Sequence, residues 1–270
     1  MFESLITQGY CRIANWLEPQ ELGLCRENLD LARAWADVNG SSNGNYSVMA
    51  DRRPHPLYSK ITACLALIRA EGAALTDTVR TDAVYFDTGQ FKFPWHQDHE
   101  PYFQYWDNRN QLTFWIPLIK TQPDLAGLEL VALDLLRARV GESLYLDRFE
   151  GRGAKLFTVH GSRTRVVDDY RGDSFWLDFD INQLAHAPSL MPGDLLIFRG
   201  DVMHRSQAGG HRAAMAVRTY NSSAWVLRKD IVDCSAPQQV MMSRNPRGYA
   251  RIIKAFTDQP HVDRLRVKDI

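Results

Sequence analysis

Residues 93–100 read FPWHQDHE and bring a histidine, His96, to within two positions of an aspartate, Asp98. Side chains alternate between the two faces of an extended strand, so residues two positions apart project to the same side. An imidazole nitrogen and a carboxylate oxygen then lie next to each other, in positions suited to one metal ion. An H-x-D pair is common by chance, so its meaning depends on the rest of the chain.

A third candidate ligand follows a turn and an apolar run in the C-terminal half. Residues 191–198 read MPGDLLIF, which predicts a turn and then a strand, and His204 comes shortly afterwards. Two histidines and one carboxylate form the facial triad of mononuclear non-haem Fe(II) oxygenases, which leaves metal positions open for substrate and O₂. We therefore predict that His96, Asp98 and His204 bind a metal and form the catalytic centre.

The composition is that of an ordinary globular protein. Of the 270 residues, 45% are hydrophobic and 24% charged, and Lys+Arg and Asp+Glu are equal at 32 each, so nothing indicates a nucleic-acid partner. No apolar run is long enough to cross a membrane and no signal-peptide pattern is present, so we expect no membrane partner and a cytoplasmic location. The cysteines lack metal-site spacing and are predicted to be small buried residues: Cys11, Cys25, Cys64 and Cys234.

The pattern of apolar residues divides the chain into three parts of one domain. Residues 1–80 are predicted to be a mainly helical support, with helices starting near 18–22 and running over 58–75, and a short strand at 10–13. Residues 81–225 are rich in short strands and form the core. Residues 226–270 return to helix and loop, and the best helical pattern covers 249–256.

The core part contains several predicted strands and one long stretch without a clear period. The strands are predicted at 82–88, 90–95, 111–118, 128–132, 195–198 and 213–220. The last two are expected to pair around the loop that bears His204. Residues 133–190 show no clean period, so we expect an irregular insertion of the kind that serves as a lid or an assembly surface.

Helices followed by many short strands predict helices packed on a β-sandwich or open barrel rather than βαβ units. A jelly roll brings its early and late strands together. Its mouth could therefore unite His96 and Asp98 with His204.

Several motifs, in this order, resemble the phytanoyl-CoA dioxygenase family over about residues 80–225. They are KFPWHQD at 92–98, LTFWIPL at 112–118, PGD at 192–194 with His204, and RAA at 212–214. The resemblance implies an Fe(II)- and 2-oxoglutarate-dependent oxygenase on a double-stranded β-helix, a mainly β jelly roll with flanking helices and a cupin-like form. The N-terminal helices, the insertion and the C-terminal tail lie outside the resemblance.

In this family an arginine beyond the distal histidine holds the far carboxylate of 2-oxoglutarate, since its planar fork matches both oxygens. Arg212 fits the family's R-x-A context and is favoured. Arg218 stays open, because the interval from His204 to Arg212 is short for the family. The two arginines are an even number of positions apart on one predicted strand, so both are expected on the same face.

Further residues are candidates for contact with the cosubstrate or substrate. Thr113 and Trp115 share a strand face and are expected to flank the cosubstrate, with core packing an equally open role. Lys92 is a candidate partner for a carboxylate of either molecule. His99 and Glu100 are expected to support the ligands or contact the substrate. The aromatic residues of 102–106 are expected to wall the substrate pocket.

The resemblance also implies the type of reaction. Halogenating relatives carry a small residue in place of the aspartate, so Asp98 favours hydroxylation of an unactivated C–H, with desaturation and ring formation open. The expected substrate is a small organic molecule, with secondary metabolism as the setting, and the enzyme is a monomer or homodimer. Two alternatives are a cupin-like metalloenzyme that needs no 2-oxoglutarate and a catalytically silent β-sandwich binding protein.

Overall fold

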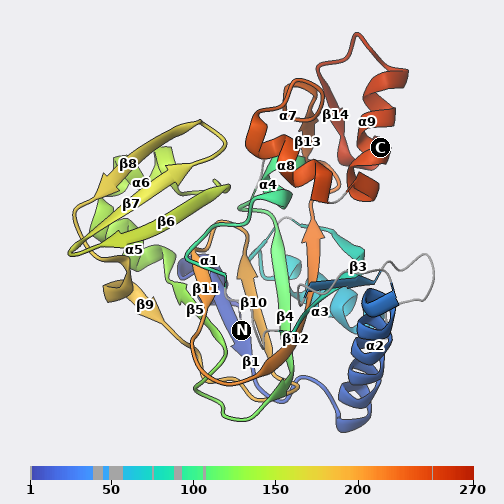
Figure 1. Cartoon of the computed structure of the whole chain (residues 1–270), viewed down its shortest axis with the longest axis vertical. Helices are drawn as coiled ribbons and strands as arrows, with labels where there is room; N and C mark the ends of the chain where they lie inside the picture. Colours follow the sequence, from blue (N-terminus) through green and yellow to red (C-terminus); the bar gives the residue numbers. More distant parts are fainter. Residues whose placement is uncertain are drawn as a thin grey trace.

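The computed structural model describes residues 2–38, 45–48, 57–74, 76–87, 93–105, 108–244 and 246–270. Two antiparallel β-sheets face each other, and helices cover the outer side of the larger sheet (Figure 1). The predicted class, mainly β with flanking helices, is confirmed.

The larger sheet has six strands in the order β1-β10-β4-β12-β3-β2. Its strands are β1 Tyr10–Ile13, β2 Asn45–Val48, β3 Thr78–Asp87, β4 Leu112–Lys120, β10 Leu195–Arg199 and β12 Arg212–Tyr220. The expected pairing of β10 with β12 is wrong, because β4 lies between them: Trp115 is opposite Leu196 on one side and Ala216 on the other. A strand as continuously apolar as β4 is stable at the centre of a sheet, where both faces are covered.

Alternation along β4 separates the two cores of the protein. Phe114 and Ile116 pack with the N-terminal helices, whereas Trp115 packs between the two sheets, and Thr113 projects to the same side as Trp115. The helices on the outer face are α1 Glu3–Thr7, α2 Pro19–Val38 and α3 Tyr58–Ala70. The predicted helices and the short strand at 10–13 are therefore confirmed, and three cysteines are buried in this outer core: Cys11, Cys25 and Cys64.

The smaller sheet is assembled from two three-stranded pieces, β11-β5-β9 and β6-β7-β8. Its strands are β5 Leu128–Val131, β6 Lys155–His160, β7 Arg163–Asp168, β8 Asp173–Leu177, β9 Ala185–His186 and β11 His204–Ser206. The segment 93–98 joins the two pieces, since His96 forms β-bridges with Leu156 on one side and with His204 on the other. The H-x-D segment thus lies inside this sheet.

The expectation that residues 133–190 are irregular is wrong. Besides β6–β9 they form α5 Leu133–Val140, α6 Glu142–Arg148 and the 3-10 helix η1 Ile181–Leu184. The strands β6 and β7 are joined by a two-residue hairpin turn, in which Gly161 adopts a positive φ of 62°. Their alternation is masked in the sequence by the charged side chains of the exposed face, such as Arg163 and Arg165.

The C-terminal residues form a separate small core above the sheets (Figure 1). Its elements are β13 Trp225–Leu227, α7 Arg228–Ile231, α8 Ala236–Arg244, α9 Pro246–Asp258, β14 Arg264–Arg266 and the 3-10 helix η2 Val267–Asp269. The predicted helix at 249–256 is confirmed within α9, and the division into three parts stays a prediction. Among the described residues, no helix is long and apolar enough to span a membrane.

Candidate metal centre

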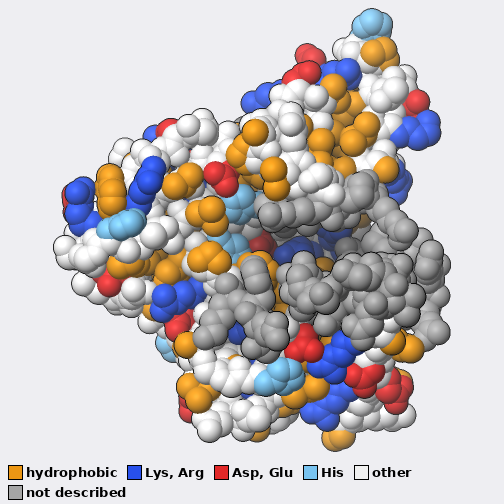
Figure 2. Space-filling view, viewed as in Figure 1, with side chains coloured by type: hydrophobic (Ala, Val, Ile, Leu, Met, Phe, Trp, Pro, Cys, Tyr) orange, Lys and Arg blue, Asp and Glu red, His pale blue; other side chains and the backbone are white. Residues whose placement is uncertain are grey.

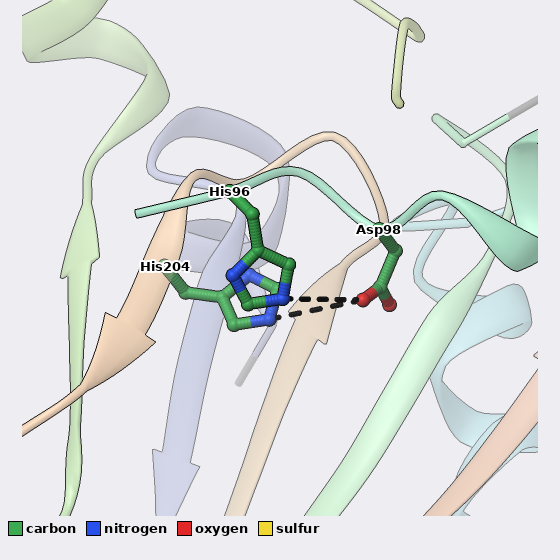
Figure 3. Close-up of side chains that lie close together, drawn as sticks. All are labelled: His96, Asp98 and His204. Atoms are coloured by element: carbon green, nitrogen blue, oxygen red, sulfur yellow. Dashed lines mark ion pairs between the residues drawn. The ribbon is translucent and has the colours of Figure 1, made fainter. Parts of the chain in front are cut away.

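The three predicted ligands come together at one point of the smaller sheet. His96 and His204 form an antiparallel pair in which each backbone N–H donates to the other's carbonyl at 2.9 Å. Their imidazole centroids are 4.2 Å apart. Asp98 extends from the end of the same segment as His96, and both rings point toward its carboxylate (Figure 3).

The distances suit a single shared ion. Asp98 Oδ1 lies 3.9 Å from His96 Nε2 and 3.8 Å from His204 Nε2. The three candidate ligand atoms all lie within 4.8 Å of one another. One small ion placed between them would therefore contact two nitrogens and one oxygen.

Backbone carbonyls fix the orientation of both imidazoles. His96 Nδ1 lies 2.8 Å from Pro94 O, and His204 Nδ1 lies 3.0 Å from Val202 O. A carbonyl oxygen only accepts hydrogen bonds, so each Nδ1 carries the hydrogen and donates it. Each Nε2 then presents its lone pair toward Asp98, which is the arrangement that a metal-binding histidine requires.

Electrostatics favour the protonation states that bind metal. Burial lowers the pKa of His96, and the neighbouring His204 lowers it further, so the His96 ring is neutral at pH 7. Burial opposes ionisation of Asp98, but Arg218 and the two imidazoles outweigh it and hold the pKa of that carboxyl below its ordinary value. The site is therefore one carboxylate with a neutral imidazole beside it.

A buried amide holds the end of the ligand segment in place. The Asn108 side chain donates to Asp98 O at 3.2 Å and to Gly200 O at 3.1 Å. Gln97, between the two ligands, points to the opposite side of the segment and donates to Asp201 O at 2.7 Å. These bonds connect the segment to the loop that precedes His204.

The triad lies on the wall of a cavity of about 480 Å³ between the two sheets. In the space-filling view, histidine, acidic and basic side chains gather at the centre of this face of the molecule (Figure 2). Besides the triad, the lining includes five of the predicted candidates: His99, Thr113, Trp115, Arg212 and Arg218. Lys92 and the side chain of Glu100 lie outside the described residues.

Arg212 is buried in this cavity, with only 2% of its surface exposed. Its guanidinium donates to Ala126 O at 2.9 Å, to Gly127 O, and to Ser206 Oγ at 3.0 Å, and its Nε has no partner. Burial lowers its pKa to about 10. Among the described residues no carboxylate pairs with it, so Arg212 is a buried cation with no anion beside it.

Arg218 projects from the same face of β12 as Arg212, as alternation predicts, and also lines the cavity. Its Nε lies 3.7 Å from Asp98 Oδ2. The two arginines therefore differ in surroundings: Arg212 is enclosed by neutral acceptors, whereas Arg218 has the carboxylate of the triad beside it.

Of the aromatic residues after the H-x-D segment, Tyr102 and Phe103 do not wall this cavity as expected. Tyr102 and Phe103 pack with Ala154 and Tyr170 in a small core of their own, and the side chains of 105 and 106 are not described. Tyr102 and Phe103 lie on the helix α4, Glu100–Tyr105. His211 is exposed, and its Nε2 lies 2.7 Å from Asp87 Oδ1.

Other residues line the cavity without having been predicted to do so. Three aromatic walls come from the strands and from the start of the ligand segment: Phe86, Phe93 and Phe198. Ser206 contributes a hydroxyl, and Asp169, in the turn after β7, bonds to His99 Nε2 at 3.0 Å. Alternation along β10 could have identified Phe198, but no sequence signal places Asp169 here.

The donor set fits iron. Two imidazole nitrogens and one carboxylate oxygen are ligands that suit Fe(II), and the remaining positions would face the cavity. A neighbouring buried arginine provides a place for an anionic ligand of the metal. The arrangement could therefore hold a metal ion, an anionic ligand of that ion and a small molecule at the same time.

No protein-family model and no curated protein matches the chain, so the resemblance to the phytanoyl-CoA dioxygenase family stays a prediction. Solved structures do match. The non-haem alpha ketoglutarate dependent carbocyclase SnoK from nogalamycin biosynthesis is 16% identical, with a TM-score of 0.54 over 83% of this chain and 84% of that one.

Two further structures are similar. EctD from S. alaskensis, with 2-oxoglutarate and 5-hydroxyectoine, is 15% identical, with a TM-score of 0.53 over 83% of this chain and 76% of that one. The epimerase SnoN, in complex with Fe3+, alpha ketoglutarate and nogalamycin RO, is 15% identical, with a TM-score of 0.50 over 83% and 84%. These likenesses show the fold, and they confirm the predicted jelly roll.

Proposed function

We propose that this protein is an Fe(II)- and 2-oxoglutarate-dependent dioxygenase of the phytanoyl-CoA dioxygenase type that hydroxylates an unactivated C–H of a small organic molecule. The triad supplies the ligand set, and the cavity has a size suited to a small molecule. The structures that share the fold include proteins crystallised with iron or with 2-oxoglutarate.

The observation that carries the proposal is Arg212. A buried guanidinium without a carboxylate is costly, so a ligand that supplies the missing negative charge would stabilise it. Arg212 bonds to Ser206, two residues after His204 on β11, which places it beside the metal centre. A dicarboxylate bound to the metal at one end would meet Arg212 at the other, with Trp115 alongside: its ring centroid lies 5.6 Å from Arg212 Cζ.

Each residue then has a defined role. His96, Asp98 and His204 hold the metal, and Arg212 binds the far carboxylate of the cosubstrate, flanked by Thr113 and Trp115. When bound, Fe(II) and 2-oxoglutarate supply oxygen activation coupled to loss of CO₂ from the cosubstrate. The apolar walls exclude water from the reacting C–H and orient the substrate. With Asp98 in place as a ligand, the proposed outcome is hydroxylation.

The test is an anaerobic titration of the apo-protein with Fe(II) and 2-oxoglutarate, following the weak visible charge-transfer band of the chelate. We expect a band that requires 2-oxoglutarate and that weakens in Arg212→Gln. Arg165→Gln, an exposed arginine on β7, is the matched control and should leave the band unchanged. Loss of the band in Arg218→Gln instead would move the anchor to Arg218.

Two other outcomes would contradict the proposal. Iron bound without the band would indicate a cupin-like metalloenzyme that needs no 2-oxoglutarate. A wild-type protein that binds no iron would indicate a catalytically silent binding protein.

A further inference from the structure

The two carboxylate oxygens of Asp98 face different partners. Oδ1 faces both imidazoles, at 3.8 and 3.9 Å, while Oδ2 lies 3.7 Å from Arg218 Nε. A separation of 3.7 Å is an ion-pair distance and too long for a hydrogen bond. Arg218 Nε is buried without a hydrogen-bond partner, and the guanidinium makes no hydrogen bond to any residue that the structure describes.

Arg218 and Arg212 approach the triad from different sides. Arg212 reaches Ser206, next to the His204 side of the site, and Arg218 reaches the Asp98 side. Between them on the same face of β12 lie Ala214 and Ala216, whose small side chains leave space in front of the strand. The two guanidiniums are therefore separate binding groups of one cavity.

When the site is filled as proposed above, Asp98 is shared between Arg218 and the metal, and among the described residues Arg218 has no carboxylate of its own. Of the described residues that line the cavity, the charged ones, histidines aside, are Arg212, Arg218, Asp98 and Asp169. Asp169 is bonded to His99, Asp98 would be bound to the metal, and Arg212 would hold the cosubstrate. Among the described lining residues, Arg218 is then the cation whose donors stay unused, in a cavity with mainly apolar walls, where an unpaired charge is costly.

We propose that the substrate is a small, largely apolar molecule carrying a carboxylate, and that Arg218 binds this carboxylate beside Asp98. This inference rests on the proposed function. The planar guanidinium matches both oxygens of a carboxylate, and its donors are not used by the residues described. The apolar body of the substrate would lie against Phe86, Phe93 and Phe198, which face the same cavity.

The rings of Phe86, Phe93 and His96 follow one another along the cavity wall and end at the metal centre. Phe86 and Phe93 meet edge to face with centroids 5.9 Å apart, and Phe93 lies 5.7 Å from the His96 ring. A substrate held at its carboxylate by Arg218 would be confined between these rings and the metal. The carboxylate would thus select which carbon faces the metal.

The test measures binding rather than turnover. The full chain is loaded with Zn(II), which is redox-inert, and saturated with 2-oxoglutarate, each step being verified by calorimetry. A panel of alkyl and aryl carboxylates, their primary amides and the corresponding phosphate monoesters is then titrated. We expect at least one carboxylate to bind about 10- to 100-fold more tightly than its amide, the range for a hydrogen-bonded charged group.

Variants assign that preference to one residue. Arg218→Gln should remove the preference while leaving the affinity for the amide unchanged, and Arg218→Lys should restore part of it. Arg165→Gln is again the matched control. Thermal unfolding of each variant verifies that it is folded.

Four results would overturn the inference. They are the absence of any carboxylate preference in the wild type, a preference that survives in Arg218→Gln, an equal weakening of carboxylate and amide, and tighter binding of the phosphate esters. A loss of Zn(II) affinity in Arg218→Gln with the preference intact would assign Arg218 to positioning Asp98 only. If Zn(II) or 2-oxoglutarate does not bind, the proposed function fails at that step, and the panel is run on the metal-free chain.

Discussion

His96 and His204 are held together by their own main chains, through two reciprocal hydrogen bonds of 2.9 Å. The separation of these two proposed ligands therefore does not depend on their side chains. Replacing one imidazole should remove a metal ligand without opening the strand pair that carries it.

Metal binding is expected to fail in His96→Ala while the fold is retained. Losing an outer partner of a metal ligand already costs about 10- to 100-fold in affinity, so losing a ligand should cost at least about 100-fold. Equilibrium dialysis against Fe(II) or Zn(II), with circular dichroism to verify folding, measures this. His211→Ala, which removes an exposed histidine, is the control, and equal losses in both variants would show that His96 is not a ligand.

Gly153→Ala should disturb the metal centre by displacing the Asn108 side chain that holds the Asp98 backbone. A Cβ at Gly153 would overlap the Asn108 amide nitrogen and would lie 2.7 Å from Tyr102 Cβ and 2.8 Å from Asp98 O. Overpacking of this kind costs about 1–3 kcal/mol, and displacement of Asn108 would release the backbone of Asp98. We expect lower stability in urea unfolding and weaker metal binding.

A second glycine provides the matched control for that substitution. Gly23 lies in α2, and a Cβ added there would meet no atom within 4 Å. Gly23→Ala should raise stability by up to about 1 kcal/mol, since alanine favours a helix over glycine. Unchanged metal binding in Gly153→Ala would refute the role of Asn108 in holding Asp98.

The ion pair of Lys155 and Asp168 is buried next to the ligand segment. The distance is 3.1 Å and both side chains are 2% exposed, while Gln97 N–H donates to Lys155 O at 3.0 Å. Burial lowers the pKa of Lys155 to about 8, against the opposing effect of Asp168, so the lysine is charged at pH 7. Removing one partner of such a pair costs about 3–5 kcal/mol.

Lys155→Met should therefore be strongly destabilised at pH 7, because it leaves the Asp168 carboxylate buried without a cation. The double variant Lys155→Met with Asp168→Asn should regain much of the loss, since asparagine is neutral and can still accept from Arg171 N–H, as Asp168 does at 3.0 Å. Urea unfolding of the four members of this cycle measures the coupling. If the effects of the two substitutions on the free energy of unfolding were additive, Lys155 and Asp168 would not act as a pair.

The sequence was sufficient to predict that His96, Asp98 and His204 lie close together, because their positions follow local rules. Alternation places His96 and Asp98 on one side of their segment, and the turn and apolar strand before His204 mark where the third ligand belongs. Alternation also placed Arg212 and Arg218 on one face. These features depend on a few neighbouring residues, which a sequence shows directly.

Features that depend on long-range pairing were not predicted. The charged exposed faces of β6 and β7 concealed their alternation, so residues 133–190 were expected to be irregular. The Asn108 amide bonds to the carbonyl of Asp98 and to that of Gly200, which lies 92 positions away in the sequence. Asp169 reaches His99 from a turn of this same insertion. No local pattern encodes such contacts.

Stability should fall as the pH rises above 9, because of three buried thiols. Burial raises the pKa of Cys11 and Cys25 to about 12 and that of Cys64 to about 11, from 9.0. Above pH 9 the unfolded chain releases these protons while the folded chain keeps them, so proton loss favours unfolding. Each thiol can lower the free energy of unfolding by up to about 1.4 kcal/mol for each pH unit above 9.

Urea unfolding under reducing conditions between pH 8 and 10.5 measures this slope. Cys25→Ala should unfold with a shallower dependence on pH, whatever its stability at pH 8. Parallel curves for Cys25→Ala and the wild type would show that this thiol ionises equally in both states.

The position of the H-x-D segment between β6 and β11 also orders events during synthesis. Residues 93–98 emerge long before both neighbouring strands, and His204 follows His96 by 108 positions. At the usual synthesis rate of about 5–20 residues per second, His204 is added roughly 5–20 s after His96 and Asp98. During that interval a nascent chain has only two of the three proposed ligands, so the proposed function implies that tight iron binding requires the completed polypeptide.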